Sequence, residues 1–206
     1  MLTARVGRYG GGAVGAPRKA AGRQRVARWY ARAMKRWYIS VVGGGRCTAD
    51  EYALAEEVGR LVAQEGAVLV CGGLAGIMEA AARGAKQAGG TTIGVLPGHD
   101  RSLGNPYLDY VLTSGLGHAR NLVVVSSGDA VIAIGGEFGT LSEIALAAKI
   151  GRPVIILTGW HLAHDKLEPD QMGPSLRYAS SAAQAVALAR AAVFPGDDSP
   201  RTANQP

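Results

Sequence analysis

The stretch AVIAIGGEFGTLSE, residues 130–143, decides the fold class of this chain. Its first five residues are all apolar, which is typical of a strand that is covered on both faces, and the run stops at Gly135-Gly136. The apolar spacing from Thr140 to Ile150 then favours a helix. The stretch therefore predicts a buried strand, a glycine turn and a helix in direct succession.

The same succession is repeated along most of the chain. Strands are predicted at residues 37–42, 67–71, 91–96, 110–112, 130–134 and 154–157, and helices at residues 49–65, 77–88, 118–126, 140–150 and 180–192. Thr48 and Glu51 form a capping-box pattern at the start of the first helix. Alternating helices and apolar strands predict an α/β fold: one Rossmann-like domain with a doubly wound parallel sheet and its ligand site at the carboxyl ends of the strands.

The charge of the chain is distributed unevenly. The 206 residues carry a formal net charge of +6, yet residues 1–36 hold ten Lys or Arg and no acidic residue, so the remainder is mildly acidic. We predict a basic, disordered Gly/Ala/Arg-rich extension at 1–36, a Rossmann-like nucleotide-binding domain at 37–195 and a disordered tail at 196–206. We also hypothesise that translation begins at Met34. A polyanion-binding arm and a transit peptide are alternatives for the extension. Transit peptides are rich in serine, however, and residues 1–36 contain none.

Several classes of protein are disfavoured by composition. Two cysteines exclude a disulfide framework, and no run of eighteen apolar residues suggests a membrane-spanning helix. We expect no metal site, because a loop or subunit contact is the more common role for residues 160–165, which contain two of the four histidines. A basic extension on an acidic body makes nucleic acid an unlikely partner. The composition is typical of a cytoplasmic protein.

Three predicted strands end in glycine turns: Gly43-Gly44-Gly45, Gly72-Gly73 and Gly135-Gly136. In a parallel sheet these turns lie at one edge, where glycine lets a ligand approach the backbone and the following helices offer free N–H groups to an anion. Gly139 and Thr140 are expected at a helix start, with Thr140 as its cap and as a phosphate contact. We therefore predict a phosphate site formed by these glycines and Thr140, although no complete Walker A or G-x-G-x-x-G motif is present.

Two charged residues are candidates for chemistry beside these turns. Glu143 places a carboxylate one turn into the helix, and its alternative role is a hydrogen bond back to the helix start. Arg120 stands near another helix start just before the strand at 130–134, where it could hold a phosphate or a ribose, or pair with a surface acid.

Residues 135–143, together with His118-Ala119-Arg120-Asn121, resemble the LOG (Lonely Guy) or lysine-decarboxylase-like Rossmann family. The resemblance is greater to a bacterial branch that includes molybdenum-cofactor carrier proteins, and it spans about residues 38–157. It is strengthened by residues 72–79, 105–107 and 113–117. The resemblance implies a homodimer or homotetramer.

In LOG enzymes a Pro-Gly-Gly-x-Gly-Thr-x-x-Glu motif holds a nucleotide 5′-phosphate, and an Arg–Glu pair cleaves the N-glycosidic bond. The resemblance places that pair on Arg120 and Glu143. It also places Gly135 at the position of the proline, Glu137 at that of the second glycine and Asn121 at that of a lysine. The phosphate cradle has therefore gained a carboxylate and lost a cation. A carboxylate there opposes anion binding unless it turns away or meets a cation.

Two functions follow from these residues and from the resemblance. The first is binding of a phosphorylated, nucleotide-like molecule in a carrier role, with a nucleoside monophosphate or a molybdopterin-type cofactor as the bound molecule and no cofactor required. The alternative is a nucleoside 5′-monophosphate phosphoribohydrolase, in which Arg120 orients the substrate and Glu143 stabilises the oxocarbenium ion and activates water. Lysine decarboxylation is not supported, because no lysine after residue 37 lies in a glycine turn.

Overall fold

A computed structural model describes residues 36–162 and 176–196. Contacts divide the chain after Lys35, and all described residues belong to the second unit, Arg36–Pro206. The predicted extension up to residue 35, the proposed start at Met34, His164 and the tail from residue 197 lie outside the described residues. None of the described helices is long and apolar enough to cross a membrane.

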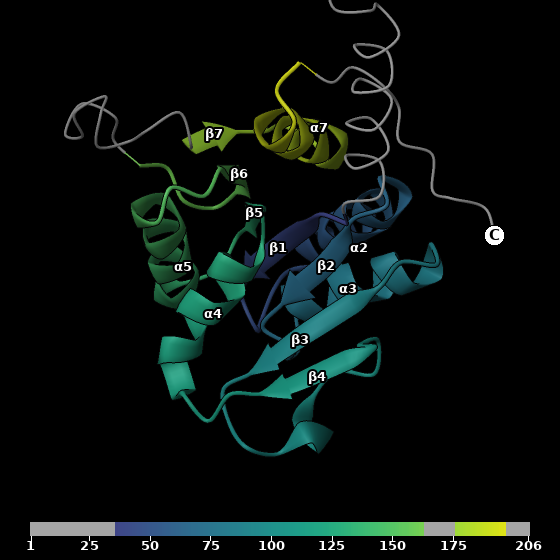
Figure 1. The fold of residues 1–206 in the computed structure, drawn as a ribbon, viewed down its shortest axis with the longest axis vertical. Coiled ribbons are helices and arrows are strands. Elements are labelled where there is room, and N and C mark those ends of the chain that lie inside the picture. Colours follow the sequence, from purple (N-terminus) through teal and green to yellow (C-terminus); the bar gives the residue numbers. More distant parts are fainter. Residues whose placement is uncertain (1–35, 163–175, 197–206) are drawn as a thin grey trace, which may run out of the picture. The chain divides into compact units, whose positions relative to one another are not determined.

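The centre of the fold is a seven-stranded sheet in which every pair of neighbours is parallel, in the order β4-β3-β2-β1-β5-β6-β7 (Figure 1). The strands are β1 Tyr38–Gly43, β2 Val68–Cys71, β3 Thr92–Leu96, β4 Tyr110–Thr113, β5 Ala130–Ile134, β6 Val154–Thr158 and β7 Leu176–Tyr178. The continuous apolar runs are buried on both faces, as the sequence predicted. The α/β, doubly wound, Rossmann-like fold is confirmed.

Helices cover both faces of the sheet. They are α2 Ala49–Gln64, α3 Ile77–Gln87, α4 Arg120–Ser127, α5 Phe138–Lys149 and α7 Ala182–Val193, with short 3-10 helices η1 Arg101–Leu103 and η2 Gly117–Ala119. Helices α2, α3 and α7 pack on one face over Ile39, Leu69 and Ile132, whereas α4 and α5 pack together on the other face over Val42 and Val131 (Figure 1). The core therefore forms two apolar layers separated by the sheet.

One local prediction is confirmed, and two local features differ from the sequence prediction. The capping box of Thr48 and Glu51 at the start of α2 is present. Helix α5 begins at Phe138, two residues earlier than predicted, with Glu137 at the N-cap and no side-chain hydrogen bond there. The expectation that Thr140 caps this helix is therefore wrong. Strand β7 was missed, because three residues are too few to give a periodic pattern.

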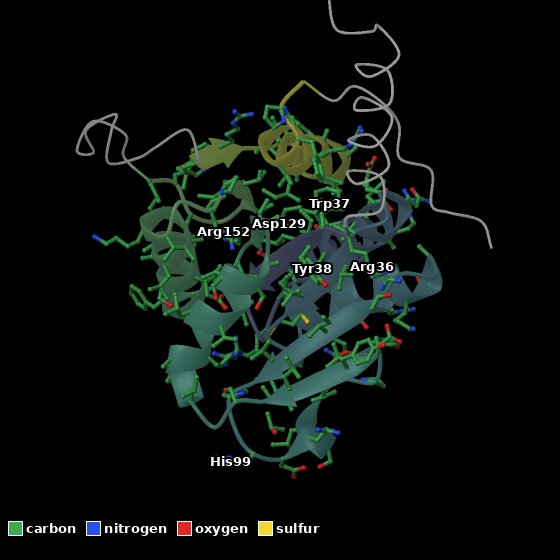
Figure 2. The ribbon with its side chains drawn as sticks, in the orientation of Figure 1. Arg36, Trp37, Tyr38, His99, Asp129 and Arg152 are labelled. Atoms are coloured by element: carbon green, nitrogen blue, oxygen red, sulfur yellow. The ribbon has the colours of Figure 1, made fainter. Side chains whose placement is uncertain are left out.

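The reversal of strand order at β1 places a crevice at one edge of the sheet. Strand β1 pairs with β2 on one side and with β5 on the other, and in open parallel sheets ligands bind at the carboxyl ends of such strands. At the amino ends of β1 and β5, the Asp129 carboxylate accepts a hydrogen bond from the Tyr38 amide (Figure 2), and Trp37 packs edge-on against Phe194. The strand order therefore places the crevice at the carboxyl edge, beside the glycine turns.

Candidate functional site

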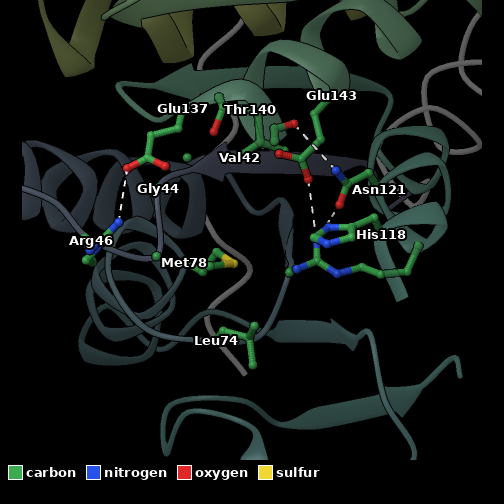
Figure 3. Close-up of a pocket in the computed structure, with 15 residues that line it drawn as sticks. Val42, Gly44, Arg46, Leu74, Met78, His118, Asn121, Glu137, Thr140 and Glu143 are labelled. Atoms are coloured by element: carbon green, nitrogen blue, oxygen red, sulfur yellow. Dashed lines mark hydrogen bonds and ion pairs between the residues drawn. The ribbon is translucent and has the colours of Figure 1, made fainter. Parts of the chain in front are cut away.

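A cavity of about 290 Å³ lies at the carboxyl ends of β1 and β5, between the glycine turns and the start of α5 (Figure 3). Its lining combines backbone from glycine turns, two arginines, two glutamates and a few apolar side chains. The lining residues are Val42, Gly43, Gly44, Gly45, Arg46, Gly72, Leu74, Met78, His118, Arg120, Asn121, Glu137, Gly139, Thr140 and Glu143. The cavity therefore draws on the loops after β1, β2 and β5 and on the start of α4.

The glycine turns after β1 and β5 touch each other. A Cβ atom added to Gly136 would lie 3.1 Å from the Gly44 nitrogen, and one added to Gly44 would lie 2.5 Å from the Arg46 carbonyl oxygen. Gly136 also has a φ of 85°, which side-chain-bearing residues rarely adopt. The Gly44 carbonyl accepts a hydrogen bond from the Ile77 amide, which fastens this turn to the start of α3. Only glycine fits such an approach, so two crossovers present their backbones at one point.

The Arg120 guanidinium packs directly against the turn after β2. A Cβ atom on Gly72 would lie 2.6 Å from both Nη1 and Nη2 of Arg120 and 2.6 Å from the Met78 sulfur. The arginine therefore occupies the space that a side chain at residue 72 would need. Arg120 itself is only 8% exposed, and its Nε is buried without a hydrogen-bond partner among the described residues.

Arg120, Asn121 and Glu143 form a buried polar network. Nη1 of Arg120 donates to Oδ1 of Asn121 at 3.1 Å and lies 3.5 Å from Oε1 of Glu143. The side-chain Nδ2 of Asn121 donates to the Ser142 hydroxyl at 3.1 Å, which links the start of α4 to the first turn and a half of α5. Glu143 is 5% exposed and does not hydrogen-bond back to the helix start. The alternative capping role for Glu143 is therefore not the one observed.

Burial dominates the electrostatics of this network. It raises the pKa of Glu143 to about 7, and the nearby Arg120 charge lowers that pKa only in part. Burial also lowers the pKa of Arg120, against the opposing effect of Glu143. A carboxyl group that exchanges its proton near neutral pH, 3.5 Å from a guanidinium, is suited to acid–base chemistry and to accommodating an added anion.

The first turn of α5 also lines the cavity. The first amides of a helix lack intrahelical acceptors, and Gly139 and Thr140 lie in this first turn and line the cavity. Glu137 turns away from these amides, and its Oε1 lies 3.5 Å from Nη2 of Arg46, which follows the glycine turn after β1 (Figure 3). The carboxylate that the cradle gains at Glu137 thus meets a cation, which reduces its opposition to anion binding.

The structure brings together most of the residues that the sequence singled out. Gly43, Gly44, Gly45, Gly72, Gly139, Thr140, Arg120 and Glu143 line the cavity. Gly73, Gly135 and Gly136 do not: Gly73 packs against Gly94 and Leu96, and the Gly135 amide donates to Thr158. Gly136 supports the cavity indirectly, through its contact with the Gly44 turn.

Sequence reasoning assigned no role to Arg46, Leu74, Met78 and His118, which also line the cavity. His118 stands two residues before Arg120 in a stretch that carries the family resemblance, so a local signal for this residue exists. Arg46 directly follows Gly45, yet its contact with Glu137 joins residues 91 positions apart, which no local pattern reveals.

The remaining histidines, cysteines and acidic residues form no candidate metal centre in the part of the chain that the structure describes. No group of three His, Cys, Asp or Glu there could hold a metal ion. His161 stacks on Tyr178 with ring centroids 5.2 Å apart. Burial raises the pKa of Cys71 to about 11, so this thiol remains protonated at neutral pH.

Comparison with known proteins identifies relatives of this chain. The family model described as the SLOG cluster4 family matches residues 36–186. The molybdenum cofactor binding protein of Rippkaea orientalis is 39% identical, with a TM-score of 0.71, covering 78% of this chain and 99% of that one. The molybdenum cofactor carrier protein of Chlamydomonas reinhardtii is 34% identical, with a TM-score of 0.69, covering 77% and 99%. The cytokinin riboside 5′-monophosphate phosphoribohydrolase of Mycobacterium tuberculosis is 31% identical over 134 residues, 60% of this chain and 72% of that relative. The resemblance seen in the sequence is thereby confirmed.

Proposed function

The chain belongs to the SLOG cluster4 family, and we propose that it binds a phosphorylated small molecule built like a nucleotide, specifically a molybdopterin-type cofactor, in a carrier role. Both solved relatives described above are molybdenum cofactor binding or carrier proteins, and they align over nearly their whole length. The cofactor is the cargo in this proposal, and no chemistry on it is required of the protein.

The observation that carries the proposal is the convergence of backbone and guanidinium at one cavity. The Gly44 turn and the first turn of α5 provide amide groups for a phosphate, and Arg120 lies against Gly72 with a buried Nε that has no partner among the described residues. The apolar side chains of Leu74 and Met78 give the same cavity a surface suited to a planar ring. These residues fit a ligand with a phosphate at one end and a heterocycle at the other.

The test is direct binding of a molybdopterin-type cofactor released from a molybdoenzyme, measured by native mass spectrometry and by pterin fluorescence. We expect one cofactor per chain and retention through gel filtration. A dephosphorylated pterin serves as the matched ligand control and is expected to bind more weakly. Equal retention of both would contradict a site built around the phosphate.

A second function, N-glycosidic hydrolysis of a nucleoside 5′-monophosphate, is favoured by one observation. Arg120 and Glu143 lie 3.5 Å apart inside the cavity, and burial raises the pKa of Glu143 to about 7. The ionised Glu143 carboxylate would take a proton from a water molecule while the oxygen of that water bonds to the anomeric carbon. The C–N bond breaks, its electrons go to the base, and the base takes up a proton, giving free base and ribose 5-phosphate.

Hydrolysis is tested by incubating the purified protein with AMP and measuring adenine by chromatography. If the protein is a hydrolase, adenine accumulates and Glu143→Gln abolishes its release while AMP binding persists. If it is a carrier only, AMP stays intact at every protein concentration.

The assembly and location of the protein remain predictions. A homodimer or homotetramer has support from the surface of α5, where Phe138 is 80% exposed and its ring centroid lies 5.9 Å from that of Trp160. Light scattering of the purified chain measures the assembly state. Fractionation of the native cell tests the cytoplasmic location.

A further inference from the structure

We infer that Arg46 exchanges partners when the ligand binds: it leaves Glu137 and pairs with the phosphate, so that this ion pair sets the affinity of the cavity for anions. The inference rests on the proposed function, because it names the residues that regulate the same phosphate site.

The two arginines and the two glutamates that line the cavity balance one another in charge. Arg46 pairs with Glu137, and Arg120 pairs with Glu143, each at 3.5 Å between nitrogen and oxygen. When both glutamates are ionised, these side chains contribute no net charge. With both glutamates ionised, release of a cation from its carboxylate therefore increases the attraction of the side chains for a dianionic phosphate.

The two pairs differ greatly in how easily they separate. Arg120 and Glu143 are buried, with side chains 10% and 7% exposed, and Asn121 also holds the arginine. The side chains of Arg46 and Glu137 are 90% and 80% exposed, and Arg46 makes no other side-chain hydrogen bond among the described residues. Surface pairs contribute little stability, and the separated Glu137 carboxylate stays in water. Arg46 is therefore the cation that can move.

Arg46 also lies where the phosphate is expected. It directly follows Gly45, at the end of the glycine turn whose backbone touches Gly136. Its partner Glu137 is the N-cap residue of α5. Figure 3 shows this pair at one side of the cavity and Glu143 with Asn121 at the other. A guanidinium can bind a phosphate through two parallel hydrogen bonds, which is stronger than a single 3.5 Å contact with an exposed carboxylate.

The position of Glu137 explains why the helix start remains open. Thr48 and Ser181 at the N-caps of α2 and α7 accept hydrogen bonds from their first turns, whereas Glu137 accepts none from α5. Holding Glu137 against Arg46 thus keeps a competing carboxylate off the amides that the phosphate would use. Without Arg46, Glu137 is free to occupy them itself.

The experiment measures dissociation constants for AMP and for a molybdopterin-type cofactor by calorimetry at low salt. Arg46→Ala is expected to weaken binding roughly tenfold, the size of one charge-assisted contact. Glu137→Gln is expected to tighten binding by roughly three- to tenfold, because it removes a repulsive charge and frees Arg46. In the Arg46→Ala background Glu137→Gln should still tighten binding, because the Glu137 carboxylate, no longer paired with Arg46, both repels the phosphate and competes for the first amides of α5.

Matched controls separate this effect from a general change of charge. Asp50→Asn and Arg101→Ala make the same charge changes at exposed residues outside the cavity. If the unaltered chain binds neither probe, the proposed function fails and the inference fails with it. If the chain binds but the Arg46 and Glu137 variants behave like their controls, only the inference fails. Weaker binding by Glu137→Gln would also overturn it, since Glu137 would then contact the ligand itself.

Discussion

Replacing Glu143 by Gln should flatten the dependence of stability on pH. Glu143 is 5% exposed, and burial raises its pKa from 4.5 to about 7 in the folded protein. The folded state therefore binds the Glu143 proton more tightly than the unfolded state does. This contribution to stability is complete below about pH 4.5 and is lost as the pH rises through 7.

The size of the effect follows from the two pKa values. One pKa unit corresponds to about 1.4 kcal/mol, so the difference amounts to about 3 kcal/mol of unfolding free energy. The assay is urea denaturation at several pH values between 4.5 and 8, in buffers without phosphate, which would occupy the site. Wild type should lose about 3 kcal/mol more than Glu143→Gln over this range.

A control with a pKa shift of the opposite sign is available on the surface. Hydrogen bonds from Arg60 lower the pKa of Glu57 below 4.5, so its contribution to stability is present above about pH 4.5 and is lost only as the pH falls further; Glu57→Gln should therefore leave the pH dependence between 4.5 and 8 close to that of wild type. Parallel stability curves for wild type and Glu143→Gln would refute the conclusion that Glu143 is buried with a raised pKa.

Two further substitutions test the packing of the site and the fold separately. Gly72→Ala places a methyl group 2.6 Å from both terminal nitrogens of Arg120, so it should displace the guanidinium and weaken AMP binding roughly tenfold, at a stability cost of about 1–3 kcal/mol; unchanged affinity in calorimetry would argue against a role for Arg120 in binding. Thr48→Ala removes the capping box with Glu51 and should lower the free energy of unfolding by about 1 kcal/mol in urea titrations. Its AMP affinity should not change, and a loss of binding would show that the cap also shapes the site.

Local patterns were sufficient for the core of the fold and for the glycine turns. Buried parallel strands carry a strong signal, and residues 130–134 form β5 as predicted. The start of α5 was misplaced because Phe138-Gly139 after a glycine pair suggests a turn, whereas the helix includes both residues. A largely exposed aromatic side chain and a glycine give no helical periodicity, so the sequence could not indicate this start.

The sequence alone predicted only part of the candidate site. Arg120 and Glu143 could be named because both stand in recognisable stretches. Whether they meet depends on the packing of α4 against α5, which brings together residues 23 positions apart. The partnership of Arg46 with Glu137 depends on β1 pairing with β5, a contact between distant segments. Local sequence defines turns and caps, whereas tertiary structure decides which charges pair.

The most direct measurement is an amide NMR titration with a phosphorylated ligand, either AMP or a molybdopterin-type cofactor. If amides from separate crossovers jointly bind the phosphate, the largest shifts should fall on Gly44, Gly45, Gly139 and Thr140, and they should saturate together. Shifts centred on another region, such as the loop at residues 99–104, or no saturable shift with either ligand, would contradict the account.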